Sequence, residues 1–236
     1  MQPVSGLRFL VASAALVSAA LAVGCTVENV NIRPAENESE STFIFGEVKN
    51  PTDGYAEVRV NGSLFDAGGN VVDSLFAEVC GRAIKPHETI PFRTSYREST
   101  ARTPIANYEL HVDSTPTQPL PDASLAISDL RVEAHEPDYT EIAGTVTNTG
   151  SERYEGVTVC AAFYDSSGKV DGLLSGLMED TIDPGRWASF WVHGAMVGGG
   201  PTPDAVTYRL WIGPEPGRLP SPGDRAPVST DKLPLR

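Results

Sequence analysis

The chain of 236 residues contains two copies of one sequence pattern, and this internal repeat constrains the fold more than any other feature. Residues 44–50 and 142–148 share Ile, Gly, Val and Asn at an offset of 98 residues. Further matches follow in the same order: Tyr55, Val58, Val60, Asp66, Gly69 and Val71 with Tyr154, Val157, Val159, Asp165, Gly168 and Val170, then Ile84, Pro86, Phe92, Tyr108 and Leu110 with Ile182, Pro184, Phe190, Tyr208 and Leu210. The order of the matches indicates duplication of a module of roughly 90 residues, a usual size for one domain.

Each copy has the pattern of β-strands. Apolar residues alternate with other residues over 57–64 and again over 157–163, which is the period of a strand with one buried face. Turn-forming residues separate these runs at 50–54, 67–70, 148–151 and 166–168, and no segment has a convincing helical period. We therefore expect an all-β protein with two tandem immunoglobulin-like β-sandwich domains, each of six or seven strands.

The expected boundaries follow from the repeat and from composition. Residues 1–24 are predicted to be a signal peptide, 25–113 the first sandwich, 114–124 a stiff polar linker, 125–213 the second sandwich and 214–236 a disordered Pro-rich tail. The polar segment 31–42 is expected to form a long loop in the first sandwich.

The N-terminus has the layout of a secretory signal. One basic residue, Arg8, precedes an apolar stretch, and small residues lead to Cys25. Residues 21–25 resemble a bacterial lipobox, although Ala22 stands where Leu is usual. We expect lipidation at Cys25 and a lipid-anchored protein that faces the periplasm or the cell exterior. Ordinary signal cleavage nearby is the alternative.

Charge and cysteine content exclude some roles. The formal net charge of -13 repels nucleic acid and anionic headgroups, so no nucleic-acid partner is expected. Cys80 and Cys160 fall in different repeats and lack zinc-site spacing. Two buried, unpaired thiols are the favoured interpretation, and a disulfide between the repeats is the alternative.

Both repeats resemble the FxLYD domain, a module of prokaryotic exported proteins and lipoproteins. The second repeat carries the resemblance at 144–148, 162–165, 168–170, 182–185 and Phe190, and the first at 46–50, 63–66, Gly69 and 85–86. Gly62 and Ala161 replace the leading Phe of the motif, and Phe65 replaces its Tyr in the first repeat. The resemblance implies a sandwich fold and an exported setting, with no catalytic residues to transfer.

The shared Asp and Gly of the motif are interpreted as turn residues. Asp66 and Asp165 can accept backbone N–H groups, while Gly69 and Gly168 can adopt a positive φ. A calcium site that uses Asp165, Ser167 and Asp171 is the less favoured alternative, because calcium needs about six or seven oxygen ligands and an ordered loop.

No constellation of residues predicts catalysis, a metal or a cofactor. The histidines are scattered, at His87, His111, His135 and His193. Ser175 lies one place too late for a nucleophile elbow. The segment 198–201 lacks the Lys of a phosphate-binding loop and is expected to be a flexible connection.

All three tryptophans fall in the second repeat. If the last two strands are neighbours in one sheet, Trp191 and Trp211 share an outer surface with Arg209, and Trp187 lies near the strand entry. Such a patch can mark a binding site. The alternatives are that this face packs on the first repeat or the tail, or that Trp191 belongs to the core.

These observations favour a non-enzymatic envelope lipoprotein that binds an unknown envelope protein or polymer. A structural spacer or assembly factor without a ligand pocket is the main alternative. A hydrolase with an unrecognised site is a third hypothesis, and it requires a cleft with converging titratable groups.

Overall fold

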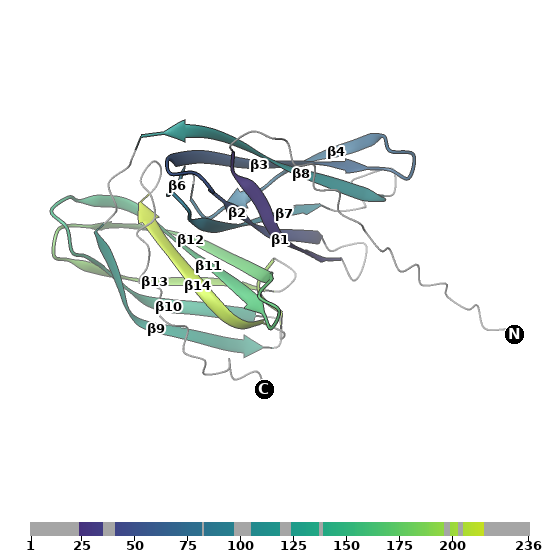
Figure 1. Cartoon of the computed structure of the whole chain (residues 1–236). Helices are drawn as coiled ribbons and strands as arrows, with labels where there is room; N and C mark the ends of the chain where they lie inside the picture. Colours follow the sequence, from purple (N-terminus) through teal and green to yellow (C-terminus); the bar gives the residue numbers. More distant parts are fainter. Residues whose placement is uncertain are drawn as a thin grey trace, which may run out of the picture.

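The protein is all-β in the part of the chain that the structure, a computed structural model, describes: residues 24–34, 41–81, 83–96, 105–118, 124–136, 139–195, 199–202 and 205–214 (Figure 1). The strands are β1 (Thr26–Arg33), β2 (Thr42–Lys49), β3 (Tyr55–Phe65), β4 (Val71–Phe76), β5 (Glu78–Val79), β6 (Ala83–Ile84), β7 (Thr89–Tyr96), β8 (Asn107–Thr117), β9 (Leu125–Glu136), β10 (Tyr139–Asn148), β11 (Tyr154–Asp165), β12 (Val170–Ile182), β13 (Trp187–Ala195) and β14 (Ala205–Pro214).

Each repeat forms two antiparallel sheets. The first repeat has one sheet in the order β1-β2-β7-β5 and a second in the order β4-β3-β6, with β8 on the other side of β3. The second repeat has the sheets β13-β10-β9 and β12-β11-β14. Ile142, Val159 and Phe163 meet between the two sheets of the second repeat, and Ile44, Leu64 and Leu75 between those of the first. The paired sheets therefore have the β-sandwich arrangement.

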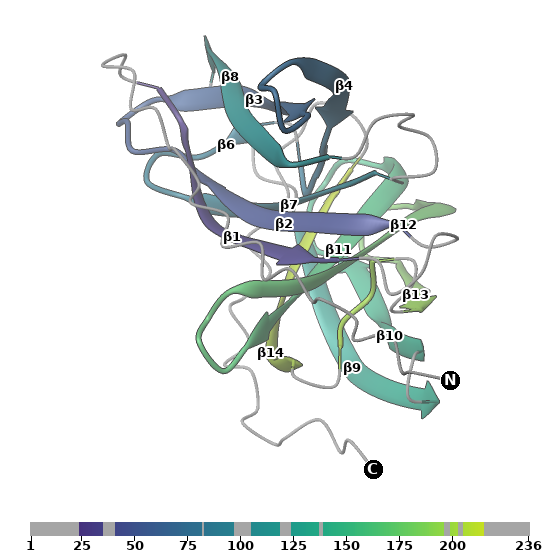
Figure 2. The same cartoon turned by 90° about the vertical axis from the view of Figure 1, so that its right-hand side faces the viewer.

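The four sheets are stacked, and the two inner ones contact each other. Figures 1 and 2 show the sheet β1-β2-β7-β5 of the first repeat facing the sheet β12-β11-β14 of the second. Both central strands of this contact are buried on both faces, over 42–48 in β2 and 159–164 in β11. A sandwich strand with one solvated face would alternate instead. The inner sheets thus form an apolar layer between the repeats, where Phe43 and Phe45 share a cluster with Tyr164 and Trp211.

Residues shared by the two repeats have matching structural tasks. The ring of Phe92 covers Gly46, where an added Cβ would lie 2.6 Å from the ring, and Phe190 covers Gly144, where the distance would be 2.8 Å. Only glycine fits beneath either ring. Each repeat also has a buried Asn whose Nδ2 donates to backbone carbonyls, those of Gly54, Ile84 and Lys85 for Asn50 and those of Glu152 and Ile182 for Asn148.

Two predicted boundaries are corrected. The loop predicted over 31–42 begins later, because Asn31–Arg33 continue β1 and pair with β2. The linker predicted from residue 114 also begins later, because β8 continues to Thr117, which pairs with Tyr55. The predicted signal peptide except Gly24, and the predicted tail beyond Pro214, lie outside the described residues.

Candidate functional site

Two tryptophans lie on the outer face of the second repeat. Trp187 and Trp191 belong to β13, and their exposed fractions are 66% and 65%. Because side chains alternate along a strand, residues four apart point to the same face, about 13 Å from each other. We call the outward surface of the sheet β13-β10-β9 the Trp face, defined by Trp187, Ser189 and Trp191 of β13, Ala143 and Thr145 of β10, and Arg131 of β9.

The Trp face contains an open depression of about 540 Å³ beside Trp191. Trp191 pairs with Ala143 on β10, and Ala143 pairs with Arg131 on β9, so these three residues cross the sheet in one row. The lining combines the short Ala143 at the centre of the row with aromatic and polar groups around it: Asp129, Arg131, Glu141, Ala143, Gly144, Thr145, Ser189, Phe190 and Trp191. The depression therefore offers an indole, hydroxyl groups and charges of both signs.

Trp211 and Arg209 do not belong to this face, and the predicted four-residue patch is corrected. Strand β14 pairs with β11, whereas β13 pairs with β10, so the last two strands lie in different sheets. Trp211 is only 7% exposed and packs in the apolar layer between the repeats. The guanidinium of Arg209 lies 5.3 Å from the ring centre of Tyr164.

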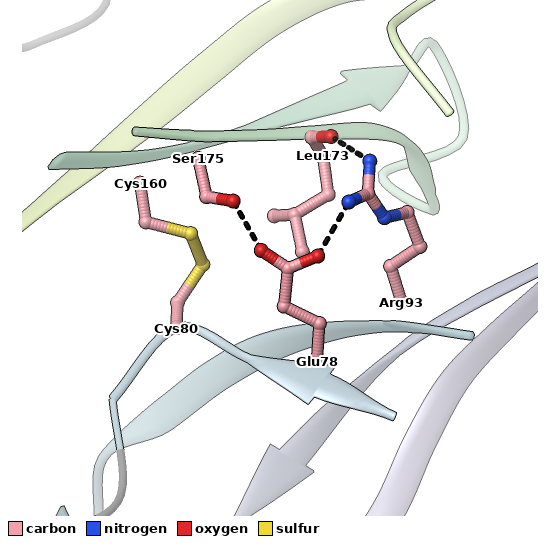
Figure 3. Close-up of a disulfide and its surroundings, with 6 residues drawn as sticks. All are labelled: Glu78, Cys80, Arg93, Cys160, Leu173 and Ser175. Atoms are coloured by element: carbon pink, nitrogen blue, oxygen red, sulfur yellow. Dashed lines mark hydrogen bonds and ion pairs between the residues drawn. A yellow bond between two sulfur atoms is a disulfide. The ribbon is translucent and has the colours of Figure 1, made fainter. Parts of the chain in front are cut away.

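A disulfide joins the repeats, contrary to the favoured prediction of two unpaired thiols. Cys80 and Cys160 are bonded, with Cα atoms 5.8 Å apart, a usual separation for a disulfide (Figure 3). Cys80 follows β5, where the chain leaves the edge of one sheet to pair with β7 of the other. This change of sheet places Cys80 next to Cys160, in the middle of β11.

Polar contacts surround the disulfide. In Figure 3 the carboxylate of Glu78 accepts a hydrogen bond from the hydroxyl of Ser175 and forms an ion pair with Arg93. Nη1 of Arg93 also donates to the carbonyl oxygen of Leu173 at 2.9 Å. Ser175 is thus engaged at the contact between the repeats.

A buried hydrogen bond crosses the centre of the same contact. The hydroxyl of Tyr164 donates to Oε1 of Glu47 at 3.1 Å, and Asn29 donates to the other carboxylate oxygen. Burial raises the pKa of Tyr164 above its ordinary value, and the negative charge of Glu47 raises it further.

Arg33 occupies one end of the contact between the repeats. Its Nη1 donates to the carbonyl oxygens of Gly200 and Asp171 at 2.8 and 3.3 Å, and its guanidinium lies over the rings of Phe43 and Phe45. Burial lowers the pKa of Arg33, against the opposing effect of Asp171. Gly199 and Gly200 are buried here, in the segment predicted to be a flexible connection; Gly198 lies outside the described residues.

Asp66 and Asp165 form the predicted turns, whereas Asp171, a residue of the calcium alternative, has a different partner. Oδ1 of Asp66 accepts the N–H groups of Gly68 and Asn70, and Oδ1 of Asp165 accepts those of Ser167 and Lys169. Gly69 and Gly168 have φ angles of 80° and 81°. Hydrogen bonds from Asn70 are the main cause of the lowered pKa of Asp66. Asp171 instead accepts two hydrogen bonds from Thr202, and burial raises its pKa.

The remaining candidates are dispersed. The backbone N–H of Cys25 donates to the Ser114 hydroxyl at 3.4 Å, and burial raises the pKa of its thiol. His87 contacts Asp53, His111 and His193 are exposed, and the side chain of His135 lies outside the described residues. No cluster of three or more His, Cys, Asp and Glu side chains suited to a metal occurs among the described residues. The described part of the chain also contains no helix with the length and apolar character needed to cross a bilayer.

No protein-family model matches this chain, and no curated protein matches it. Among solved structures it is similar to a Bacteroides uniformis β-glucuronidase 2 (TM-score 0.28, 12% identity, 77% of this chain and 25% of that chain) and to the Amycolatopsis orientalis exo-chitosanase CsxA (TM-score 0.27, 12% identity, 83% and 26%). The chain thus spans about a quarter of the length of these proteins. Similarity at this level does not indicate a function, and the fold defines an all-β protein of stacked antiparallel sheets.

Proposed function

We propose that this protein is a non-enzymatic, lipid-anchored envelope protein whose second repeat binds an envelope component through the Trp face. The observation that carries the proposal is the exposure of Trp187 and Trp191 on one surface. Large exposed aromatic side chains are costly to leave in water, and they are enriched at the centres of binding sites.

The disulfide supports an exported location. Disulfides form and persist in oxidising compartments such as the periplasm and the cell exterior, and they are rare in the cytosol. Cys80 and Cys160 are only 4% and 3% exposed, so the bond belongs to the buried layer between the repeats. The signal-like N-terminal sequence points to the same compartment, and lipidation at Cys25 would place the anchor directly before β1.

The binding part of the proposal is tested with the mature chain and isolated cell envelopes. The variant Trp187→Ser/Trp191→Ser should lose retention on the envelopes, while Phe76→Ser should keep it. Phe76 is 78% exposed on β4 of the first repeat, so it is a matched aromatic control on another surface. Equal retention of both variants would remove the Trp face from the proposal.

The anchor is tested separately in cells. Metabolic labelling with a palmitate analogue should mark the wild-type protein and not Cys25→Ala. Labelling that persists in Cys25→Ala would rule out this site.

One observation favours a second candidate, a rigid spacer. The repeats share an apolar layer and a covalent bond, so the described part of the chain holds its two outer faces in a fixed relation. A spacer needs this rigidity and does not need the Trp face. If the protein is only a spacer, the Trp double variant would therefore complement a deletion strain as well as the wild-type protein does.

A further inference from the structure

The Trp face of the second repeat corresponds to a surface that the first repeat uses for docking. Phe45 of β2 pairs with Arg93 on β7 and with Asn31 on β1. In the second repeat Ala143 pairs in the same way with Trp191 and Arg131. The row Asn31, Phe45 and Arg93 is covered by the second repeat, whereas the row Arg131, Ala143 and Trp191 opens into the depression.

The change from Phe45 to Ala143 creates the depression. In the first repeat, Phe43 and Phe45 fill the surface and pack against the partner sheet. In the second repeat the corresponding residues of β10 are Glu141 and Ala143, so neither of these β10 positions has a large apolar side chain. A surface that lacks these side chains suits a ligand that enters the depression better than a flat protein partner.

A second copy of this chain does not fit the Trp face in the manner of the first contact. That contact uses the outer surface of β11 and β14, where Cys160 pairs with Trp211. The first repeat has Asn61 paired with His111 at this place, and Glu109 and Asp113 beside them are exposed. Because this surface is polar and charged, a further copy cannot repeat the apolar packing.

We infer that the depression binds a sugar ring of an uncharged envelope glycan, with Trp191 as the stacking platform. This inference rests on the proposed function and names its ligand class. The face of an indole carries negative charge density and attracts the C–H groups of a pyranose ring. Ring hydroxyls both donate and accept hydrogen bonds, which matches the hydroxyls of Thr145 and Ser189 and the charged groups of Asp129 and Arg131.

Charge and spacing define the glycan further. A chain with a net charge of -13 repels anionic polymers, so a neutral sugar, including an N-acetylated one, is favoured. Trp187 lies about 13 Å from Trp191 along β13 and gives an extended polymer a second contact. A longer oligomer should therefore bind more tightly than a single sugar.

The experiment measures binding of β-1,4-linked N-acetylglucosamine oligomers and glucose oligomers to the mature protein by NMR shifts and calorimetry. We expect at least one of these series to bind. Trp191→Ala should weaken that binding about two- to tenfold, the range for an aromatic contact. Ala143→Phe should weaken it as well, because it restores the filled surface of the first repeat. Trp187→Ala should weaken only the longer oligomers.

The outcomes separate this inference from the proposed function. Binding that is unchanged in Trp191→Ala and Ala143→Phe, both shown to be folded by circular dichroism, would overturn the inference. Absence of oligomer binding, together with Trp191-dependent retention that protease treatment of the envelopes abolishes or with Trp191-dependent binding to a purified envelope protein, would overturn the sugar inference and leave the proposed function standing. If retention on envelopes does not depend on either Trp, both the glycan inference and the proposed function are overturned. Release of shortened oligomers would contradict the non-enzymatic role.

Discussion

The hydroxyl of Tyr164 in the second repeat donates a hydrogen bond to the carboxylate of Glu47 in the first, and both residues are buried. This pair lies beside the buried apolar cluster between the repeats, where an unpaired carboxylate is costly, and Asn29 also donates to the Glu47 carboxylate. The pair therefore ties the register of one inner sheet to that of the other.

Removing the Tyr164 hydroxyl should destabilise the protein at neutral pH. Tyr164→Phe leaves the buried Glu47 with one donor fewer, and we expect a loss of about 1–3 kcal/mol in the free energy of unfolding, measured by urea denaturation. A loss within experimental error would show that water or Asn29 replaces the hydroxyl.

The same pair predicts a pH dependence. The pKa of Tyr164 is higher in the folded protein than in the unfolded chain, where it is about 10. The folded state then retains a proton that the unfolded chain releases, so this contribution is complete below about pH 10 and is lost as the pH rises above it. The stability difference between wild type and Tyr164→Phe should narrow above about pH 10. Glu47→Gln, which removes the negative charge, should weaken this dependence.

Truncation of Trp211 and of Trp191 should change the stability of the protein by very different amounts. Trp211→Ala removes a buried ring from the layer between the repeats and should cost about 3–5 kcal/mol. Trp191→Ala removes an exposed ring and should change stability by less than about 0.5 kcal/mol. Thermal unfolding of the two variants in parallel checks the prediction, and similar losses for both would contradict the assignment of the Trp face.

Removal of the disulfide should destabilise the folded state of both repeats. Cys80→Ala/Cys160→Ala is expected to lower the free energy of unfolding by about 2–5 kcal/mol, a typical value for a native disulfide. The matched control is Cys25→Ala, compared with wild type in the mature chain produced without the lipid, where the Cys25 thiol is free and its removal should have little effect. Mass spectrometry of the alkylated protein with and without reduction detects the bond directly, and free Cys80 and Cys160 thiols in the purified mature protein would refute it.

Glycine is required beneath the ring of Phe92, as it is beneath the equivalent ring of Phe190. Gly46→Ala places a Cβ 2.6 Å from the ring of Phe92 and 3.3 Å from the carbonyl oxygen of Glu28, and such overpacking costs about 1–3 kcal/mol. Gly54→Ala is the control, since its Cβ would meet only the Thr52 hydroxyl oxygen at 4.0 Å. Equal stability of the two variants would mean that Phe92 moves aside without cost.

Much of the fold could be predicted because local rules and tertiary packing agree. The alternation around Val58 and Val157 marks strands with one core face, and the turn residues separate them. The internal repeat also predicted which segments of the two halves have equivalent positions in the fold. The prediction of an all-β protein is confirmed, since the described residues form only strands, turns and irregular segments.

The contact between the repeats was predicted only as an alternative, although the sequence contains a signal for it. Residues 43–45 and 160–164 are apolar on both faces of their strands, a pattern typical of strands buried on both sides. The partner of Cys80 had no comparable signal, because its position depends on β5 crossing to the other sheet. The error for Trp211 has the same origin: alternation placed it opposite the core of its own repeat, but a second core covers that side.

The replacement of Phe45 by Ala143 at equivalent positions bears on how a duplicated module diversifies. If both repeats had the large apolar row, one apolar surface would remain exposed, and the protein could assemble head-to-tail into open filaments. Here the first repeat has the apolar row and buries it against the second repeat, whereas the second repeat has an open depression beside Trp191. The tandem is thus a closed unit whose two outer faces differ, because one has a depression beside Trp191 and the other, around Asn61 and His111, is polar and charged.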